Sequence, residues 1–228
     1  MKIKMLIKSA CLAAIMLITA CGKDQDTASG TAGLTQYYIA GQYNYNLSPS
    51  VTNVPIPYAI ILNTNSECTF VDAIFGVVKG SYTYANGHLI TNFGGTVQLV
   101  ATFDFTVANN TITGASTDGL GLLTYKLEKT PASNSFSNNE YTGAITFTGG
   151  QHFFAYLSFS DSQYNIDQTG YNTPDQAYTL QNNAVATTTV NGVNSVFVFD
   201  NGAIMMMSYK PPAVVNGGSG YIYGTFTK

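Results

Sequence analysis

Hydrophobic and polar residues alternate with a period of two along most of the chain after residue 35. The clearest run covers residues 97–107, and shorter runs cover residues 43–47, 123–128 and 153–159. The apolar positions of the first run are Val97, Leu99, Ala101, Phe103, Phe105 and Val107. A strand that buries one face and exposes the other has this period, and β-branched and aromatic residues fit its pleated surface. The pattern therefore predicts a series of antiparallel strands.

Pairs of residues that tolerate a positive φ angle separate these runs. They are Asn86-Gly87, Asn109-Asn110, Asp118-Gly119, Gly149-Gly150, Asn191-Gly192 and Asn201-Gly202. Such pairs suit the tight turns of β-hairpins. Short strands joined by tight turns predict an all-β fold, in which an antiparallel meander closes or stacks so that few strand edges stay bare.

One stretch predicts a helix instead. Thr173-Pro174-Asp175-Gln176 offers an N-cap hydroxyl, a proline at the first helical position and a capping-box glutamine. The apolar residues Ala177, Tyr178 and Leu180 follow. We expect one short helix near residues 174–182, which either caps a barrel or connects two strands.

A polar stretch at residues 131–139 divides the body into two halves. We predict a β lobe at residues 35–130, a linker at residues 131–139 and a second β lobe at residues 140–228, each barrel-like or sandwich-like. The alternative is a single β domain over residues 35–228. Each half ends with a Phe-x-Phe run, a turn and a closing strand, which a diverged duplication explains and which similar composition alone also explains.

The first 20 residues have the pattern of a secretory targeting segment. Lys2, Lys4 and Lys8 make it positive, and residues 10–18 are apolar but too short to span a bilayer of ~30 Å as a helix. We predict a signal peptide at residues 1–20. The small polar residues that follow predict a flexible tether over residues 21–34.

The end of this segment, Ile18-Thr19-Ala20-Cys21, resembles the lipobox of bacterial lipoproteins, in which a branched apolar residue and two small residues precede an obligatory cysteine. The resemblance covers residues 1–26. It implies that signal peptidase II cleaves before Cys21 and that Cys21 carries a lipid anchor, because several acyl chains at one residue give durable membrane attachment. The alternative is an ordinary secretory signal with a chance cysteine.

The residues after Cys21 indicate the destination of such a lipoprotein. In the inner-membrane retention signal that such lipoproteins resemble, an aspartate directly follows the lipidated cysteine. Gly22 occupies that position here, so the resemblance implies delivery to the bacterial outer membrane. Lys23-Asp24-Gln25-Asp26 is similar to the surface-export tag of Bacteroidota lipoproteins, although Gln25 interrupts the acidic pair. We therefore expect the body at the cell surface, with the periplasm as the alternative.

Composition narrows the choice of partners. Charged side chains make up 9% of the sequence, which contains nine lysines, no arginine and 12 acidic residues. A protein that reads phosphates needs a basic face, so this composition excludes most nucleic-acid binders. Removal of residues 1–20 takes away three lysines and no acid, which lowers the formal net charge from −3 to −6. A body of this charge disfavours anionic lipids, so we expect contact with the membrane through the lipid anchor.

Residue types that carry catalysis or hold metals are sparse. The two histidines, His88 and His152, lack the spacing of metal ligands, and no Gly-x-Ser-x-Gly motif occurs. Asp161 and Asp167 bracket an oxygen-rich segment that lacks the glycine and glutamate of an EF-hand loop. Cys11 leaves with the predicted signal peptide and Cys21 carries the lipid, so Cys68 is the one cysteine left, and we expect it to be a buried free thiol. We predict no metal, no cofactor and no enzymatic activity; a hydrolase whose carboxylates converge in space is the lesser alternative.

Tyrosine is the residue type that most suggests binding, because the chain contains 16 Tyr and 13 Phe but no Trp. Tyrosines two residues apart share one sheet face, where they either form an aromatic platform for a ligand or stabilise the sheet as cross-strand pairs. The candidate ligand-binding residues are Tyr43, Tyr45, Tyr82, Tyr84, Tyr221 and Tyr223.

These features together predict an outer-envelope lipoprotein with a non-enzymatic β body. The expected ligand is an external protein, a glycan or a small apolar molecule. An accessory subunit of an envelope assembly or secretion complex, which recruits its partners by strand addition, is the alternative.

Overall fold

The computed structural model describes residues 33–95, 98–106, 111–211 and 220–228. Within these ranges the chain is almost entirely β, and its helical segments are two 3-10 turns, η1 (Leu34–Gln36) and η2 (Thr64–Ser66). The predicted signal peptide, the lipidation site Cys21 and most of the predicted tether lie outside the described residues. The same ranges contain no helix that is both long enough and apolar enough to cross a membrane. Leu34 is fully buried, so the folded body includes the last residue of the predicted tether.

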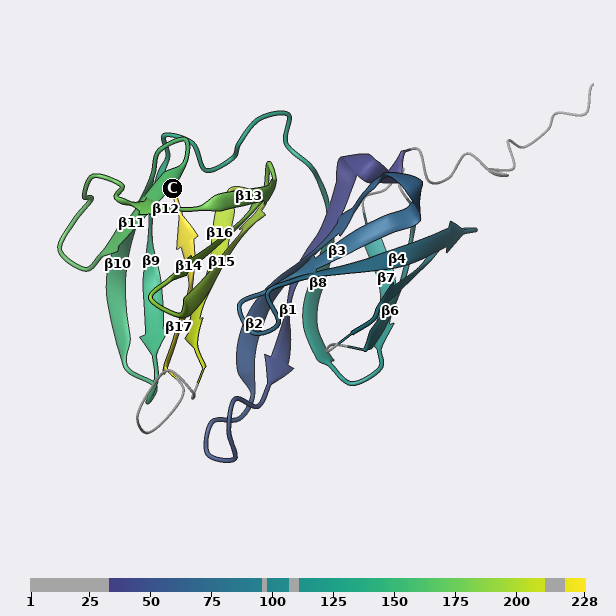
Figure 1. Ribbon diagram of the computed structural model, residues 1–228, viewed down its shortest axis with the longest axis horizontal. Coiled ribbons are helices and arrows are strands. Elements are labelled where there is room, and N and C mark those ends of the chain that lie inside the picture. Colours follow the sequence, from purple (N-terminus) through teal and green to yellow (C-terminus); the bar gives the residue numbers. More distant parts are fainter. Residues whose placement is uncertain (1–32, 96–97, 107–110, 212–219) are drawn as a thin grey trace, which may run out of the picture.

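Residues 37–129 form an antiparallel sheet of eight strands that curls into a nearly closed barrel (Figure 1). Its strands are β1 (Tyr37–Tyr45), β2 (Val54–Leu62), β3 (Glu67–Val71), β4 (Val77–Ala85), β5 (His88–Phe93), β6 (Leu99–Thr106), β7 (Thr111–Thr117) and β8 (Gly121–Lys129). Each strand from β1 to β6 pairs with the strand that follows it along the chain, and β1 also pairs with β8. The sheet is therefore a meander whose first and last strands meet, with its opening between β7 and β8.

Residues 140–227 form a second antiparallel sheet with the same plan (Figure 1). Its nine strands are β9 (Glu140–Phe147), β10 (His152–Phe159), β11 (Gln163–Asp167), β12 (Gln176–Ala177), β13 (Thr179–Asn182), β14 (Val185–Val190), β15 (Val193–Asp200), β16 (Ala203–Lys210) and β17 (Gly220–Thr227). Strand β9 pairs with β17, and the opening lies between β12 and β13. The predicted all-β meander with two barrel-like lobes is thus confirmed.

The predicted helix near residues 174–182 is wrong, because this segment forms β12 and β13. Gln176 pairs with Tyr164 of β11, and Thr179 pairs with Thr187 of β14. The capping signals favour a helical turn locally, but strand pairing supplies the backbone N–H and C=O groups with partners on both neighbouring strands. Tertiary pairing therefore outweighs the local preference.

A glycine lies where each barrel closes. Gly41 of β1 approaches the backbone of Thr124 in β8, and Gly143 of β9 approaches the backbone of Thr225 in β17. A Cβ atom would lie 2.1 Å from the Thr124 carbonyl oxygen at the first position and 2.2 Å from the Thr225 carbonyl oxygen at the second. A β-bulge follows one residue after Gly41. Glycine thus permits the close strand approach at which each sheet turns back on itself.

Aromatic side chains occupy the interior of each barrel. In the first barrel, Tyr58 stacks on Phe70 with ring centroids 5.9 Å apart. In the second barrel, Phe197 packs edge to face against Tyr164 at 4.8 Å and against Phe159 at 5.3 Å. The interior of an eight-stranded barrel is just wide enough for side chains to fill it, so these rings form the two cores.

The two barrels pack side by side, with β1 and β2 of the first against β15 and β16 of the second (Figure 1). Met205 and Met207 point from β16 into a hydrophobic cluster shared with the first barrel, whereas Met206 points into the second barrel. The Tyr38 hydroxyl donates a hydrogen bond to the Phe199 carbonyl oxygen at 2.6 Å across the same contact. The halves therefore share a hydrophobic cluster in addition to the chain that links them.

Candidate functional site

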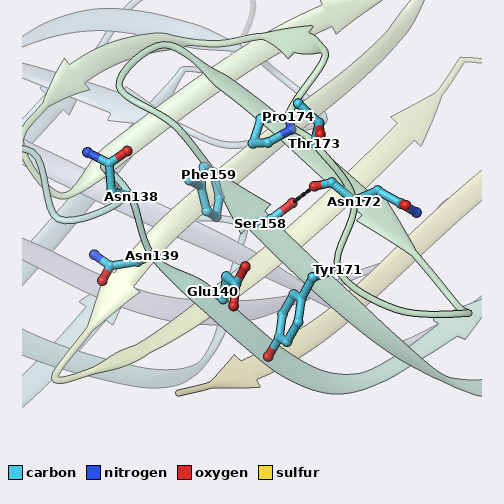
Figure 2. Close-up of a pocket in the computed structure, with 9 residues that line it drawn as sticks. All are labelled: Asn138, Asn139, Glu140, Ser158, Phe159, Tyr171, Asn172, Thr173 and Pro174. Carbon is cyan, nitrogen blue, oxygen red and sulfur yellow. Dashed lines mark hydrogen bonds between the residues drawn. The ribbon is translucent and has the colours of Figure 1, made fainter.

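An open groove lies on the second barrel between two chain segments. Figure 2 shows residues 138–140, which lead into β9, on one side and residues 171–174, from the loop between β11 and β12, on the other. The lining residues are Asn138, Asn139, Glu140, Ser158, Phe159, Tyr171, Asn172, Thr173 and Pro174. The groove has a volume of about 540 Å³, which falls within the range of small-molecule and cofactor sites.

Pairing of β9 with β10 positions the floor of the groove. Glu140 and Ser158 are cross-strand partners, so their side chains lie on the same outer face of the sheet. The Ser158 hydroxyl donates a hydrogen bond to the Asn172 carbonyl oxygen at 2.6 Å (Figure 2). This bond ties the 171–174 segment to β10, and Tyr171 then lies beside Glu140.

The loop between β11 and β12 is braced by its own side chains. The Asp167 carboxylate accepts hydrogen bonds from the Thr169 backbone N–H at 2.7 Å and from the Thr169 hydroxyl at 2.5 Å. These two bonds hold the pKa of Asp167 below its ordinary value, so the carboxylate stays charged. The Asn165 amide also donates to the Asp175 carboxylate at 3.2 Å. This wall of the groove is therefore held in place without a ligand.

The opposite wall is braced through Asp161. Its carboxylate accepts hydrogen bonds from the Ser137 hydroxyl and, at 3.3 Å, from the Asn138 amide. The Asn139 amide donates to the Ser135 carbonyl oxygen at 2.9 Å. Figure 2 shows the amide oxygen of Asn138 turned toward the groove, where it can accept a hydrogen bond.

The groove combines an exposed aromatic ring with converging polar groups. Tyr171 is 42% exposed, and its ring contacts Tyr156 edge to face at 5.1 Å. Partial desolvation and the nearby charge of Glu140 raise the pKa of Tyr171, so its hydroxyl stays protonated and can donate. Among the described residues that line the groove, Glu140 carries the one carboxylate, and none is a lysine. The site therefore offers a ring face, several hydrogen-bonding groups and a negative charge.

A second, smaller cavity lies between the ends of β9 and β11 and the start of β17. It has a volume of about 330 Å³. It is lined by Ile145, Phe147, Ile166, Asp167, Gln168 and Ile222. This mostly apolar lining suits an apolar group. The one carboxylate among its described residues, that of Asp167, already accepts hydrogen bonds from Thr169. Because a binding site needs placed polar groups to orient its ligand, the groove is the stronger candidate.

Four of the predicted ligand-binding tyrosines lie on the first barrel and belong to, or pack against, the hydrophobic cluster that the two barrels share. Tyr43 is fully buried, and its hydroxyl donates a hydrogen bond to the buried carboxylate of Asp72. Tyr82 is also buried and donates to a backbone carbonyl oxygen at 3.1 Å. Tyr45 and Tyr84 are half-buried at the edge of this cluster. The two buried rings therefore contribute to the core of the first barrel.

The other two predicted tyrosines, Tyr221 and Tyr223, stack on each other on β17 with ring centroids 6.1 Å apart. They are half-buried against the cluster that the barrels share. None of the six predicted tyrosines lines the groove that the described residues form. The sequence did carry one signal for the groove side of the sheet: the run at residues 153–159 has aromatic residues at both alternating sets of positions, where a solvated outer face is normally polar.

The remaining candidate residues lie apart from one another. His88 contacts the Asp104 carboxylate at 2.6 Å in the first barrel, and His152 contacts the Thr146 hydroxyl at 2.9 Å in the second. Cys68 is buried, which raises the pKa of its thiol to about 12. Across the part of the chain that the structure describes, no three His, Cys, Asp or Glu side chains gather closely enough to hold a metal ion.

Comparison of the chain with protein-family models, with curated proteins and with solved structures finds no match in any of the three. The groove must therefore be interpreted from its own geometry and chemistry.

Proposed function

We propose that this protein is an outer-envelope lipoprotein whose non-enzymatic β body binds a glycan in the groove of the second barrel. The observation that carries the proposal is the lining of the groove, where the exposed ring of Tyr171 lies beside the carboxylate of Glu140 and the polar groups of Asn172 and Thr173. A sugar ring has the complementary composition, with an apolar face of C–H groups and an edge of hydroxyl groups. One aromatic ring and a few hydrogen-bonding groups are therefore enough to orient it.

Each group of the groove has a role in this proposal. The ring of Tyr171 supplies apolar area with little loss of conformational freedom, because its side chain has two rotatable bonds. Glu140 accepts hydrogen bonds from sugar hydroxyls, and the asparagine amides both donate and accept. The groove is open to solvent rather than enclosed, which suits a hydrated, hydroxyl-rich ligand, whereas a small apolar ligand needs an enclosed pocket that removes most of its surface from water.

The single carboxylate supports binding without cleavage. Glycoside hydrolysis generally uses two carboxyl groups about 5–10 Å apart. Glu140 is the one carboxylate among the described residues that line the groove. A glycan in the groove would therefore meet one carboxylate among the described lining residues, where hydrolysis generally uses two.

The N-terminal pattern supports display of the groove on a membrane surface. The lipobox at residues 18–21 supplies an anchor at Cys21, and the small polar residues that follow supply a spacer before the buried Leu34. An anchored binding protein keeps an external polymer close to the cell.

Replacement of Tyr171 by alanine is expected to weaken glycan binding at least about tenfold, because removal of a central aromatic contact costs about 1.4 kcal/mol or more. The measurement is the retardation of the purified protein in native gels that contain a neutral polysaccharide, namely β-glucan, mannan or xylan. Leu123→Ala is the control, since Leu123 has a similar exposure, 48%, but lies on the first barrel. Equal retardation of Tyr171→Ala and the wild type, or no retardation of the wild type in any of these gels, contradicts glycan binding at the groove.

Protease added to intact cells is expected to digest the body of the wild-type protein. Cys21→Ser is expected to leave the membrane fraction, because it removes the residue that carries the acyl chains. Immunoblots of cells and of separated fractions measure both effects. Protection of the wild type until the outer membrane is broken contradicts surface display, and retention of Cys21→Ser in the membrane contradicts the lipid anchor.

A further inference from the structure

Three aromatic rings continue the groove along the outer face of β10. Phe154 and Tyr156 are two residues apart on this strand, so they share one face. Tyr171 reaches them from the loop between β11 and β12. Tyr156 contacts Tyr171 at a centroid distance of 5.1 Å and Phe154 at 5.2 Å, edge to face in both cases. Phe154, Tyr156 and Tyr171 are called the aromatic strip below.

The two ends of the aromatic strip are open to solvent. Phe154 is 55% exposed and Tyr171 is 42% exposed. Exposure of a large ring forfeits the free energy that its burial would supply, so adjacent exposed rings typically mark an interaction site. The edge-to-face contacts restrict the orientation of each ring, because each ring packs against its neighbour. The strip is thus preorganised, which lowers the entropic cost of binding.

Small and hydroxyl-bearing residues flank the aromatic strip. The strand partners of Tyr156 and Phe154 on β9 are Thr142 and Ala144. These two residues pair in turn with Thr227 and Thr225 on β17. Because cross-strand partners share a face, a shelf with short side chains and hydroxyl groups lies beside the rings. A chain that lies on the rings can place its hydroxyl groups against this shelf.

The charges around the aromatic strip are negative. Glu140 stands at its groove end, and Asp167 is the strand partner of Tyr156 on β11. The sequences of β9, β10 and β11 contain no lysine. Lys228, which follows β17, lies over the ring of the buried Tyr141 at 5.7 Å. This field repels a polymer with carboxylate or sulfate groups.

We propose that the groove and the aromatic strip form one continuous site for a linear glycan without acidic groups. One end of the chain occupies the groove at Tyr171, and the following sugar units lie along Tyr156 and Phe154. This inference rests on the proposed function and adds to it the length and the charge of the ligand. A protein ligand fits the surface less well, because protein hot spots are anchors sealed in pockets away from water, whereas these rings stand on an open strand.

The test is the affinity of the purified protein for gluco-, manno- and xylo-oligosaccharides of increasing length, measured by calorimetry. The hexasaccharide of the series that binds is expected to bind at least about tenfold more tightly than its disaccharide, because each added ring contact contributes binding free energy. Phe154→Ala is expected to keep the affinity for the disaccharide and to lose most of the gain with length. Phe153→Ala is the matched control: Phe153 precedes Phe154, is 42% exposed and contacts Phe147 rather than the strip.

The outcomes separate this inference from the proposed function. Equal affinity for the disaccharide and the hexasaccharide, or an unchanged length dependence in Phe154→Ala, overturns the continuous site while loss of binding in Tyr171→Ala still supports the groove. Binding of oligogalacturonate as tight as that of the neutral hexasaccharide overturns the charge selection. Absence of binding to every oligosaccharide overturns both proposals. A concentration-dependent dimer that Phe154→Ala abolishes in light scattering also overturns the inference, since the strip would then bind a second copy.

Discussion

Gly41→Ala is expected to destabilise the protein by about 3 kcal/mol or more, because a methyl group at this position collides with backbone rather than with a movable side chain. The added Cβ would lie 2.1 Å from the Thr124 carbonyl oxygen and 2.9 Å from the ring of Tyr58. Relief of this clash requires β1 and β8 to separate. Among the described strands of this sheet, β8 pairs with β1 alone, so the change weakens the one ladder that joins the last strand to the first.

Urea denaturation followed by circular dichroism measures this effect as a shift of the unfolding midpoint. Gly121→Ala is the matched control on β8, because a Cβ there lies 3.9 Å from its nearest neighbour, which is ordinary contact. The free energy of unfolding of that variant is expected to equal that of the wild type or to exceed it by about 0.4–1 kcal/mol, since alanine restricts the unfolded chain more than glycine does. A midpoint of Gly41→Ala equal to that of Gly121→Ala contradicts the role of the glycine in closure.

Stability is expected to depend on pH through Asp72, by up to about 3 kcal/mol. Burial raises the pKa of Asp72 from 3.8 to about 6, although hydrogen bonds from Tyr43 and from the N–H groups of Ile74 and Phe75 oppose part of this rise. The folded protein therefore binds a proton at a pH where the unfolded chain has already lost it. The contribution of Asp72 to the free energy of unfolding is full below about pH 4 and is lost as the pH rises through about 6.

The matched variant is Asp72→Asn, which has the same shape and does not ionise. Its amide oxygen can accept the hydrogen bonds from Ile74 and Phe75, and its NH2 group can donate to the hydroxyl oxygen of Tyr43. The difference in unfolding free energy between wild type and variant isolates Asp72 from the other carboxylates. Wild type is expected to lose stability relative to Asp72→Asn between pH 4 and pH 6. A constant difference over this range contradicts a raised pKa at Asp72.

The strands and turns could be predicted from the sequence because short-range physics determines them. The alternating run at residues 97–107 contains β6, and Asn86, Asn191 and Asn201 adopt φ angles of 53°, 51° and 46° at their turns. The predicted helix failed for the opposite reason. Its signals are local, and the partners that keep residues 176–182 extended lie on β11 and β14, which only the folded chain brings close.

The candidate site was harder to predict because a period of two does not say which face of a strand points inward. Tyr43 and Tyr82 each lie two residues before another tyrosine, which is the spacing of an exposed platform, but both face the core of the first barrel. Phe154 and Tyr156 lie in a run with aromatic residues on both faces, and closure of the second barrel decides which set is outside. Tyr171 comes from a loop without periodicity, and the bond from Ser158 to Asn172 brings that loop to the strip.

The two barrels share features that reach beyond composition. In each, the first strand pairs with the last, and a glycine on the first strand approaches the backbone of a threonine on the last. Gly41 and Gly143 occupy these equivalent positions. A diverged duplication accounts for this correspondence in topology and in position, and it stays a prediction. The groove belongs to the second barrel, so after such a duplication the halves would have diverged in function.

The most direct test of glycan binding at the groove uses the absence of tryptophan from the sequence. Tyr171→Trp places the one tryptophan of the variant in the groove, and Leu123→Trp places it on the first barrel as the control. Titration with the neutral hexasaccharide is expected to shift the emission of Tyr171→Trp to shorter wavelength along a saturable curve, because stacking of the sugar excludes water from the indole, and to leave that of Leu123→Trp unchanged. Emission of Tyr171→Trp that stays constant up to saturating hexasaccharide contradicts the assignment of the groove as the glycan site.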